Sequence, residues 1–409
     1  MSYRILRITN IYSECLTNYY LRFPEIHNSS YIEQYEHLTA DSVEIAYSYS
    51  KNLRKLGVDA IDIISNADIL QSRWAIEHLL TQNISLKDLV FEQIKSYQPD
   101  IVWIDDSKLM DKSWASIVKK EVGSIKLIVS HICAPYNSKL AEFFSSVDMM
   151  FTCTPCFKKD LMKLGVETHL LYHGFDDSVL KMLGDDNSAP KYDLIFTGSL
   201  YTGYGFHKSR IEFIQKFIES NINIQIFGNL ESNSKIFFKK SMQLTINLLL
   251  KFRLNFIINN ISLLKKNENY GKTKISNYSK KLRQSVNPPI FGIEMFTALR
   301  NSNICFNIHG EIARKCAGNI RLFEATGVGI CLLTDWKDNL NELFEPEKEV
   351  VTYKTIDECI EKVNWLLKNP EEARKIAKAG QERTLKDHTI ENRAKYINQL
   401  FIKKLNENN

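Results

Sequence analysis

The sequence has little that would place the protein in a membrane or send it across one. No stretch offers about eighteen apolar residues free of charge, the length that a membrane-spanning helix requires. The first residues, MSYRILRITN, lack the basic segment and apolar core of a signal peptide. The eight cysteines are scattered, mostly within apolar segments, as in a reduced cytosolic protein. We therefore expect a cytoplasmic protein.

Motifs that bind metals are also scarce. Cys153 and Cys156 form a Cys-x-x-Cys pair at the start of a predicted helix, but no second such pair exists to complete a zinc site. We expect a structural role for this pair, with a thioredoxin-like redox role as the alternative. No Asp-x-Asp pair follows a predicted strand, which leaves a diphosphate-bound metal ion without visible ligands. The sequence thus predicts neither a metal site nor a cofactor.

The order of apolar segments predicts two α/β domains. With 409 residues, 44% of them hydrophobic and 25% charged, the chain resembles an ordinary globular protein that is too long for a single core. Short apolar runs alternate with helical patterns, which is typical of βαβ units around parallel sheets. The strands expected in the first half are Tyr3–Ile8, Ala60–Ile64, Ile101–Ile104, Lys126–Ser130, Met149–Thr152 and Thr168–Leu171. Those expected in the second half are Asp193–Thr197, Ile222–Phe227, Asn303–Ile308, Gly329–Thr334 and Glu349–Thr352.

The domain boundaries follow from the segments between these units. A polar stretch, Leu183–Tyr192, contains Gly and Pro and is typical of an interdomain linker. We predict a first domain over residues 1–182, a second over 183–388, and a final helix over 389–409 that packs back onto the first. The expected fold is two Rossmann-like, doubly wound domains that face a cleft, where ligands bind beyond the carboxyl ends of the strands.

Residues 231–283 interrupt the second domain with a basic insertion. The segment holds ten Lys and two Arg against two Glu, and within it LTINLLLKFRLNFIINNISLL is apolar. A basic amphipathic helix lying on an anionic membrane surface would explain both features. The alternative is a helical excursion packed on its own domain, with a solvated basic face. Nucleic acid is not expected, because no stacking-aromatic pattern accompanies the charge.

Two loops of the second domain could collect an anionic ligand. Phe196–Arg210 places Gly198 after a predicted strand, and Arg210 follows one turn into the next helix. Glycine permits close approach of the backbone, helix N-termini offer free N–H groups, and arginine binds phosphate through two donors. His309 follows another predicted strand end. The glycines match neither the P-loop nor the dinucleotide-binding fingerprint.

A third loop carries an acid next to a base. Gly318 and Asn319 open a predicted helix, Asn319–Thr326, which contains Arg321 and Glu324 and which we expect to break at Gly327. One interpretation is an ion pair on a solvated helix, worth a few tenths of a kcal/mol. The other is a ligand site, in which the carboxylate accepts hydrogen bonds from a ribose diol while neighbouring groups hold phosphates.

The first domain offers fewer candidates. His131 follows the predicted strand Lys126–Ser130 and would face the cleft, unless it merely caps the strand end. Asp105 and Asp106 end another strand, where one could act as a base, or both could cap the following helix.

The second half as a whole is similar to a known family. FNIHG, GNIRLFEATGVGICLLTDW, NELFEPEKEVVTY, the helical run that begins CIEKVNWLLKNPEEARK, and Arg393 resemble the C-terminal domain of GT-B glycosyltransferases, nearest to their CgeB-like subgroup. The resemblance implies that Glu324 binds the donor ribose and that Thr197–Ser199 contacts the donor phosphates. A second glutamate of the wider family is replaced here by Cys316.

The resemblance implies a metal-independent glycosyltransferase that moves a hexosyl or related group from a nucleotide-diphosphate sugar. The acceptor would be a glycan or a lipid-linked molecule of a cell-surface polysaccharide, glycolipid or glycoprotein, and the enzyme would be cytoplasmic and peripheral to the inner membrane face. On this interpretation His131 and Asp105 are catalytic, and the donor-binding residues are Gly198, Ser199, Arg210, His309, Gly318, Asn319, Arg321 and Glu324. The alternatives are a nucleotide-sugar 2-epimerase of the same fold and a non-catalytic surface or spore-coat protein.

Overall fold

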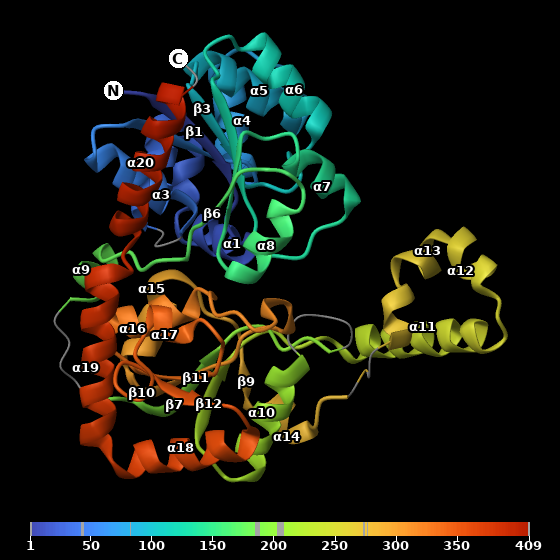
Figure 1. The fold of residues 1–409 in the computed structure, drawn as a ribbon, viewed down its shortest axis with the longest axis vertical. Coiled ribbons are helices and arrows are strands. Elements are labelled where there is room, and N and C mark those ends of the chain that lie inside the picture. The colour runs from blue at the N-terminus through green and yellow to red at the C-terminus, as the bar shows by residue number, and fades with distance from the viewer. Residues whose placement is uncertain are drawn as a thin grey trace.

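The structure, a computed structural model, describes residues 2–41, 45–81, 83–184, 189–202, 208–272, 275 and 277–407. These residues form two α/β domains stacked one above the other, with a helical arm that projects from the second (Figure 1). Each domain contains one sheet of six parallel strands, so the predicted fold class is confirmed. None of the described helices is both long and apolar enough to cross a membrane.

The N-terminal sheet is buried on both faces, which is why its strands are continuous apolar runs. Successive residues of a strand point to opposite faces. In β1, Leu6 and Ile8 therefore enter one hydrophobic cluster, while Ile5 enters the other together with Tyr3, which directly precedes the strand. The strand order is β2-β1-β3-β4-β5-β6. The strands are β1 (Arg4–Thr9), β2 (Asp59–Ile64), β3 (Ile101–Ile104), β4 (Leu127–His131), β5 (Met149–Thr152) and β6 (Thr168–Leu170).

Helices cover both faces of this sheet. One face is covered by α5, α6, α7 and α8, and the opposite face by α3 and by the last helix, α20 (Ile390–Glu407). The helices of the N-terminal half are α1 (Ser13–Arg22), η1 (Pro24–Asn28), α2 (Tyr31–Asp41), α3 (Ile45–Lys55), α4 (Asp68–Glu77), α5 (Leu86–Tyr97), α6 (Lys112–Glu121), α7 (Ser138–Phe144), α8 (Pro155–Met162) and α9 (Ser178–Leu183).

The C-terminal sheet has the same layered construction. Its order is β12-β11-β10-β7-β8-β9, and its two clusters contain Leu194 and Phe196 on one face and Ile195 on the other. The strands are β7 (Tyr192–Thr197), β8 (Ile224–Phe227), β9 (Val286–Asn287), β10 (Ser302–Asn307), β11 (Cys331–Asp335) and β12 (Val351–Tyr353).

The C-terminal helices divide between the two faces of this sheet and the arm. The faces carry α10 (Lys208–Glu219), α14 (Lys280–Ser285), α15 (Gly292–Arg300), η3 (Glu311–Ala313), α16 (Arg321–Val328), α17 (Leu340–Leu343), α18 (Ile356–Lys368) and α19 (Pro370–Asp387). The arm comprises α11 (Asn233–Lys251), α12 (Asn255–Asn260), α13 (Ser262–Lys266) and η2 (Glu268–Lys272).

The chain passes between the domains twice, and the two passages are hydrogen-bonded to each other. The first includes Phe175, and the second joins α19 to α20 (Ile390–Glu407). The N–H group of Phe175 donates to the carbonyl of His388 at 2.9 Å, and that of Ile390 donates to Phe175 at 2.9 Å. The last helix, α20, then packs on the N-terminal sheet, where Ile397, Phe401 and other apolar residues fill the cluster of Trp103 (Figure 1).

One local prediction in the second domain was wrong. The helix around Glu324 does not break at Gly327: it continues to Val328 and ends at Gly329, whose φ of 82° is left-handed. Gly327 is required for another reason, since a Cβ atom there would lie 2.3 Å from the ring of Phe175. Residues 185–188 of the expected linker lie outside the described part.

Candidate donor site between the domains

A cavity of about 450 Å³ lies between the two domains and is large enough for a cofactor-sized ligand. The C-terminal domain contributes most of its lining, including the loops after β7 and β8, the start of α15 and the start of α16. The N-terminal domain contributes Tyr12, Glu14 and Ser48, and the first passage contributes Phe175 and Asp176. Of the eight predicted donor-binding residues, six line this cavity: Gly198, Ser199, Arg210, Asn319, Arg321 and Glu324.

The loop after β7 brings the main chain to the wall of the cavity. Gly198 packs against the neighbouring loop so closely that a Cβ atom on Gly228 would lie 2.2 Å from the Gly198 carbonyl oxygen. Only glycine fits at position 228, next to the Gly198 carbonyl. Two further glycines of the predicted loop, Gly203 and Gly205, lie outside the described residues.

Arg210, in the first turn of α10, is a cation with few partners. Its Nη1 donates to the Ser199 carbonyl at 3.3 Å and its Nη2 to the Ile308 carbonyl at 3.5 Å. Among the described residues no carboxylate oxygen lies within 4.0 Å of its guanidinium group, although ion pairs are found throughout the chain. Burial lowers the pKa of Arg210 to about 10, and the positive charge of Arg321 acts in the same direction. A buried cation without a counter-charge is suited to an anionic ligand.

Arg321 and Glu324 form the ion pair that their spacing predicts, but not on a solvated surface. Arg321 Nη1 lies 2.9 Å from Glu324 Oε2, and the two side chains are only 15% and 12% exposed. Burial raises the pKa of Glu324, while Arg321 lowers it. The interpretation of a solvated pair was therefore wrong about the surroundings: the pair belongs to the cavity wall.

Two buried polar atoms of the cavity lining, Thr197 Oγ1 and Arg210 Nε, have no hydrogen-bond partner among the described residues. A third, Glu324 Oε2, makes no hydrogen bond there and has only its ion pair with Arg321. Buried polar groups in folded proteins are nearly always satisfied, so these atoms are candidates to bind a ligand. The set matches a molecule that combines negative charge with hydroxyl groups.

The other two predicted donor-binding residues lie behind the cavity. The His309 ring donates from Nδ1 to Asp335 Oδ1 at 2.7 Å, while its Nε2 accepts from the Gly318 N–H at 3.4 Å. Gly318 and His309 are absent from the lining. Asn319 does reach the cavity, and its Nδ2 donates to Asn307 Oδ1 at 2.7 Å. His309 thus holds the loop that presents Asn319.

The N-terminal candidates have partners of their own. Asp105 accepts from Arg7 Nη2 at 2.6 Å and from Trp103 Nε1 at 2.5 Å, so both of its oxygens are engaged in a buried cluster. Asp106 accepts from Ser65 and from the N–H of Lys108. His131 lies 3.2 Å from the sulfur of Cys133, and burial lowers the pKa of His131 to about 3. None of these residues lines the cavity.

A carboxylate that the sequence reasoning overlooked does line it. Glu14 lies in the first turn of α1, immediately beyond the carboxyl end of β1, and its side chain is exposed. The rule that ligands bind beyond strand ends applied to β1 as well as to β3 and β4. The signal was therefore present in the segment TNIYSECLTN.

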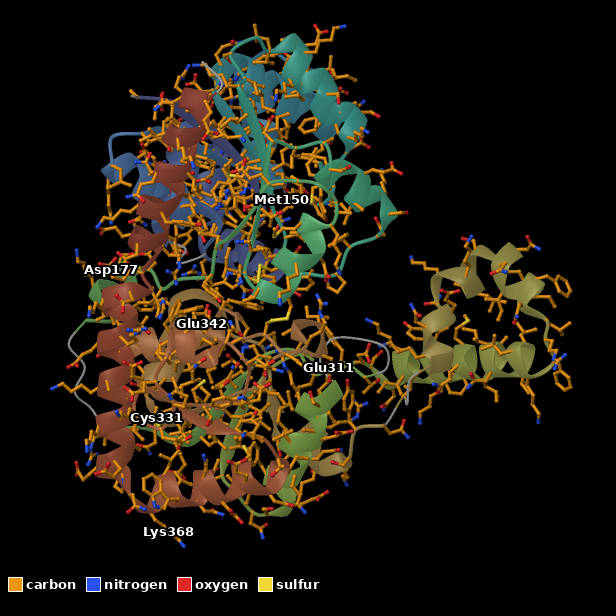
Figure 2. The ribbon with its side chains drawn as sticks, viewed as in Figure 1. Met150, Asp177, Glu311, Cys331, Glu342 and Lys368 are labelled. Atoms are coloured by element: carbon orange, nitrogen blue, oxygen red, sulfur yellow. A yellow bond between two sulfur atoms is a disulfide. The ribbon has the colours of Figure 1, made fainter. Side chains whose placement is uncertain are left out.

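Four cysteines are paired, which the scattered pattern did not predict. Cys153 and Cys156 do not pair with each other: Cys153 bonds to Cys133, and Cys156 bonds to Cys316 (yellow bonds in Figure 2). The second bond joins α8 of the N-terminal domain to the C-terminal domain. Cys133, Cys153 and His173 are the one group of described residues whose ligand atoms could hold a metal ion, but two of these three atoms are the bonded sulfurs.

Arg314 and Gly318 also contact the N-terminal domain near the bond between Cys156 and Cys316. Arg314 forms an ion pair with Asp160 of α8. A Cβ atom on Gly318 would lie 2.2 Å from the Cys153 carbonyl oxygen, so this residue must be glycine for the loop to lie against the other domain. The segment 314–318 therefore adds a third contact between the domains to the two passages of the chain.

Comparison with known proteins supports the fold. A family model described as "Glycosyl transferase-like" matches residues 253–399. A glycosyltransferase of Rickettsia africae is 12% identical over 99% of both chains, with a TM-score of 0.57. Anabaena Alr3699/HepE in complex with UDP and glucose is 11% identical over 98% of this chain and 100% of its own, with a TM-score of 0.57.

A putative UDP-N-acetylglucosamine 2-epimerase of Listeria monocytogenes is 12% identical over 100% of this chain and 98% of its own, with a TM-score of 0.50. No curated protein sequence matches the chain. At these identities the likeness establishes the fold, the two-domain GT-B arrangement of glycosyltransferase-like proteins.

Proposed function

We propose that the protein transfers a hexosyl or related group from a nucleotide-diphosphate sugar to a glycan or lipid-linked acceptor. One observation carries the proposal: the largely buried cation Arg210, the largely buried carboxylate Glu324 and the hydroxyl of Thr197 all belong to residues that line one interdomain cavity, and Arg210 Nε and Thr197 Oγ1 have no hydrogen-bond partner among the described residues. The cation would pair with the diphosphate of such a donor, and the carboxylate would accept hydrogen bonds from its ribose hydroxyls.

Arg210 and Arg321 would hold the diphosphate. Both arginines line the cavity, and their like charges repel each other. An anion bound between them would remove this repulsion. During transfer, the bond between the anomeric carbon and the diphosphate oxygen breaks while the bond to the acceptor oxygen forms. Negative charge grows on the departing diphosphate, and cations already fixed in place stabilise that charge without reorganising. Such a site performs the reaction without a metal ion.

Glu324 would accept hydrogen bonds from the ribose hydroxyls, and Glu14 would take the proton of the acceptor hydroxyl. Glu14 comes from the N-terminal domain and lies across the cavity lining from α16. Asp176 also lines the cavity, but it is already bonded to Ser48 and Ser178. Glu14 is therefore the better candidate for a base.

The acceptor in this proposal belongs to a cell-surface polysaccharide, glycolipid or glycoprotein in assembly, reached at the cytoplasmic face of a membrane through residues 231–283. A 2-epimerase of the same fold would need acids and a histidine converging on the sugar. The described lining residues include no histidine, which favours transfer.

Calorimetric titration of UDP, GDP and ADP tests the donor site directly. We expect one of the three to bind, and its sugar conjugate to be consumed only when an acceptor is supplied. Release of free nucleotide without an acceptor would support the epimerase. Absence of binding by all three at millimolar concentration would support the non-catalytic alternative and overturn the proposal.

A further inference from the structure

The arm, residues 232–272, has a small core of its own and little contact with the rest of the molecule. It is a hairpin in which α11 folds against α12, α13 and η2 around Met242, Ile246, Ile258 and Leu264. Figure 1 shows the hairpin extending away from the C-terminal domain. Its 19-residue helix α11 is about 28 Å long at 1.5 Å per residue.

The outer face of α11 is apolar and uncovered. Phe237, Leu244 and Leu248 are 73%, 62% and 46% exposed. Their spacings of seven and four residues place them on one side of the helix, opposite the buried Met242 and Ile246. Figure 2 shows side chains projecting outward along the whole hairpin. The remaining exposed apolar residues of the arm are Phe238, Leu250, Phe252, Phe256, Ile261 and Leu263.

Exposed apolar side chains are far more frequent in the arm than in the rest of the molecule. Among the described residues, 22 large apolar side chains are exposed, and nine of them fall in the arm, which is a tenth of the chain. Single exposed apolar residues are normal, but a contiguous set marks a surface that binds something.

The charge beside this face is of one sign. Five cations of the arm have no carboxylate within 4.0 Å among the described residues, and the arm itself contains a single acid, Glu268. Lys240 and Lys251 flank the apolar stripe on α11 at helical spacing. The other three are Arg253, Lys265 and Lys266. A second copy of the chain would bring like charges together, whereas anionic lipid supplies both the opposite charge and an apolar layer.

We propose that the arm docks the protein on an anionic membrane, with Phe237, Leu244 and Leu248 inserted among the lipids and the lysines against lipid phosphates. The contact itself does not depend on the transfer reaction.

The base of the arm connects this contact to the cavity. Buried Glu231 pairs with Lys239 of α11, whose Nζ donates to the Thr202 carbonyl at 2.8 Å. Glu231 Oε2 in turn accepts from the N–H and the hydroxyl of Thr202, each at 3.0 Å. Thr202 directly follows Tyr201, which lines the cavity. The arm and this loop therefore move together, so a docked arm fixes the orientation of the cavity above the membrane. This last step rests on the proposed function and implies a lipid-linked acceptor.

Co-sedimentation of the full chain with vesicles tests the docking without a donor. We expect binding to vesicles of phosphatidylglycerol and phosphatidylcholine, weaker binding in high salt, and little binding to pure phosphatidylcholine. The triple variant Phe237→Ser, Leu244→Ser, Leu248→Ser and the double variant Lys240→Gln, Lys251→Gln should each lose roughly tenfold or more in vesicle affinity. The control Leu21→Ser, Ile76→Ser, Ile117→Ser removes similarly exposed residues of the N-terminal domain and should bind as the parent does.

Equal binding to neutral and anionic vesicles, or full binding by the triple variant, would overturn the proposal. Concentration-dependent self-association that the triple variant abolishes would assign the face to a second copy instead. Nucleotide titration of the triple variant separates the two proposals, since donor affinity should be unchanged when docking is lost.

Discussion

The substitution Glu324→Gln tests whether the Glu324 carboxylate binds a ligand or only forms a structural ion pair with Arg321. Gln keeps the size of the side chain but cannot carry the charge that strengthens hydrogen bonds to hydroxyls. Such charge-assisted bonds contribute about 1.5–3 kcal/mol, so donor affinity should fall roughly ten- to a hundredfold. Stability should change little. Burial raises the pKa of Glu324, so burying its charge costs free energy, and the loss of this cost in the variant offsets the loss of the ion pair with Arg321.

The assay compares UDP with 2′,3′-dideoxy-UDP by calorimetry in the parent and in Glu324→Gln, or the corresponding pair for the preferred base. The parent should bind the dideoxy compound more weakly, and the variant should bind the two about equally. Glu294→Gln serves as the control because Glu294 is an exposed acid of α15 outside the cavity lining. An unchanged preference for the ribose hydroxyls in Glu324→Gln, or a clear loss of melting temperature with full affinity, would refute the ribose assignment.

Four further results are expected. Arg210→Met should weaken nucleoside diphosphate far more than nucleoside, because a buried cation without a counter-ion is removed, and parallel titrations measure the difference. Glu14→Gln should lower kcat with the donor KM retained, and a raised donor KM alone would argue against a base. Urea titrations should show stability falling as pH drops from about 6.5, since burial lowers the pKa of His131 and His173 to about 3 and the unfolded chain binds more protons there. Transfer should persist in chelator, and activity restored only by magnesium or manganese would contradict the cation assignment.

The strands were the most predictable part of the fold. Parallel strands buried on both faces are short apolar runs, and each predicted strand corresponds to an observed one within a few residues. The two-residue strand β9 escaped notice, because Val286–Asn287 is too short for any periodicity.

The residues that line the cavity were predictable where they lie at strand ends and offer glycine backbone or charge. Gly198, Arg210 and Glu324 follow this rule, and Glu14 would have too. Sequence could not show that Asp105 is engaged by Arg7 or that His309 stands behind the cavity, because both depend on partners distant in the chain. The pairing of Cys156 with Cys316 spans 160 residues and has no local signature.

The packing of α20 has a consequence for the order in which the molecule can be completed. Domains generally fold as units, the N-terminal one first while the ribosome is still at work. Here one face of the first sheet is closed by Ile397, Phe401 and Leu405, which are made after the whole of the second domain. The nascent first domain must therefore wait, with Trp103 and its neighbours uncovered, until the second domain and α20 have been synthesised. Up to residue 390 the chain contains the full core of the second domain but only part of the core of the first, the reverse of the usual sequence.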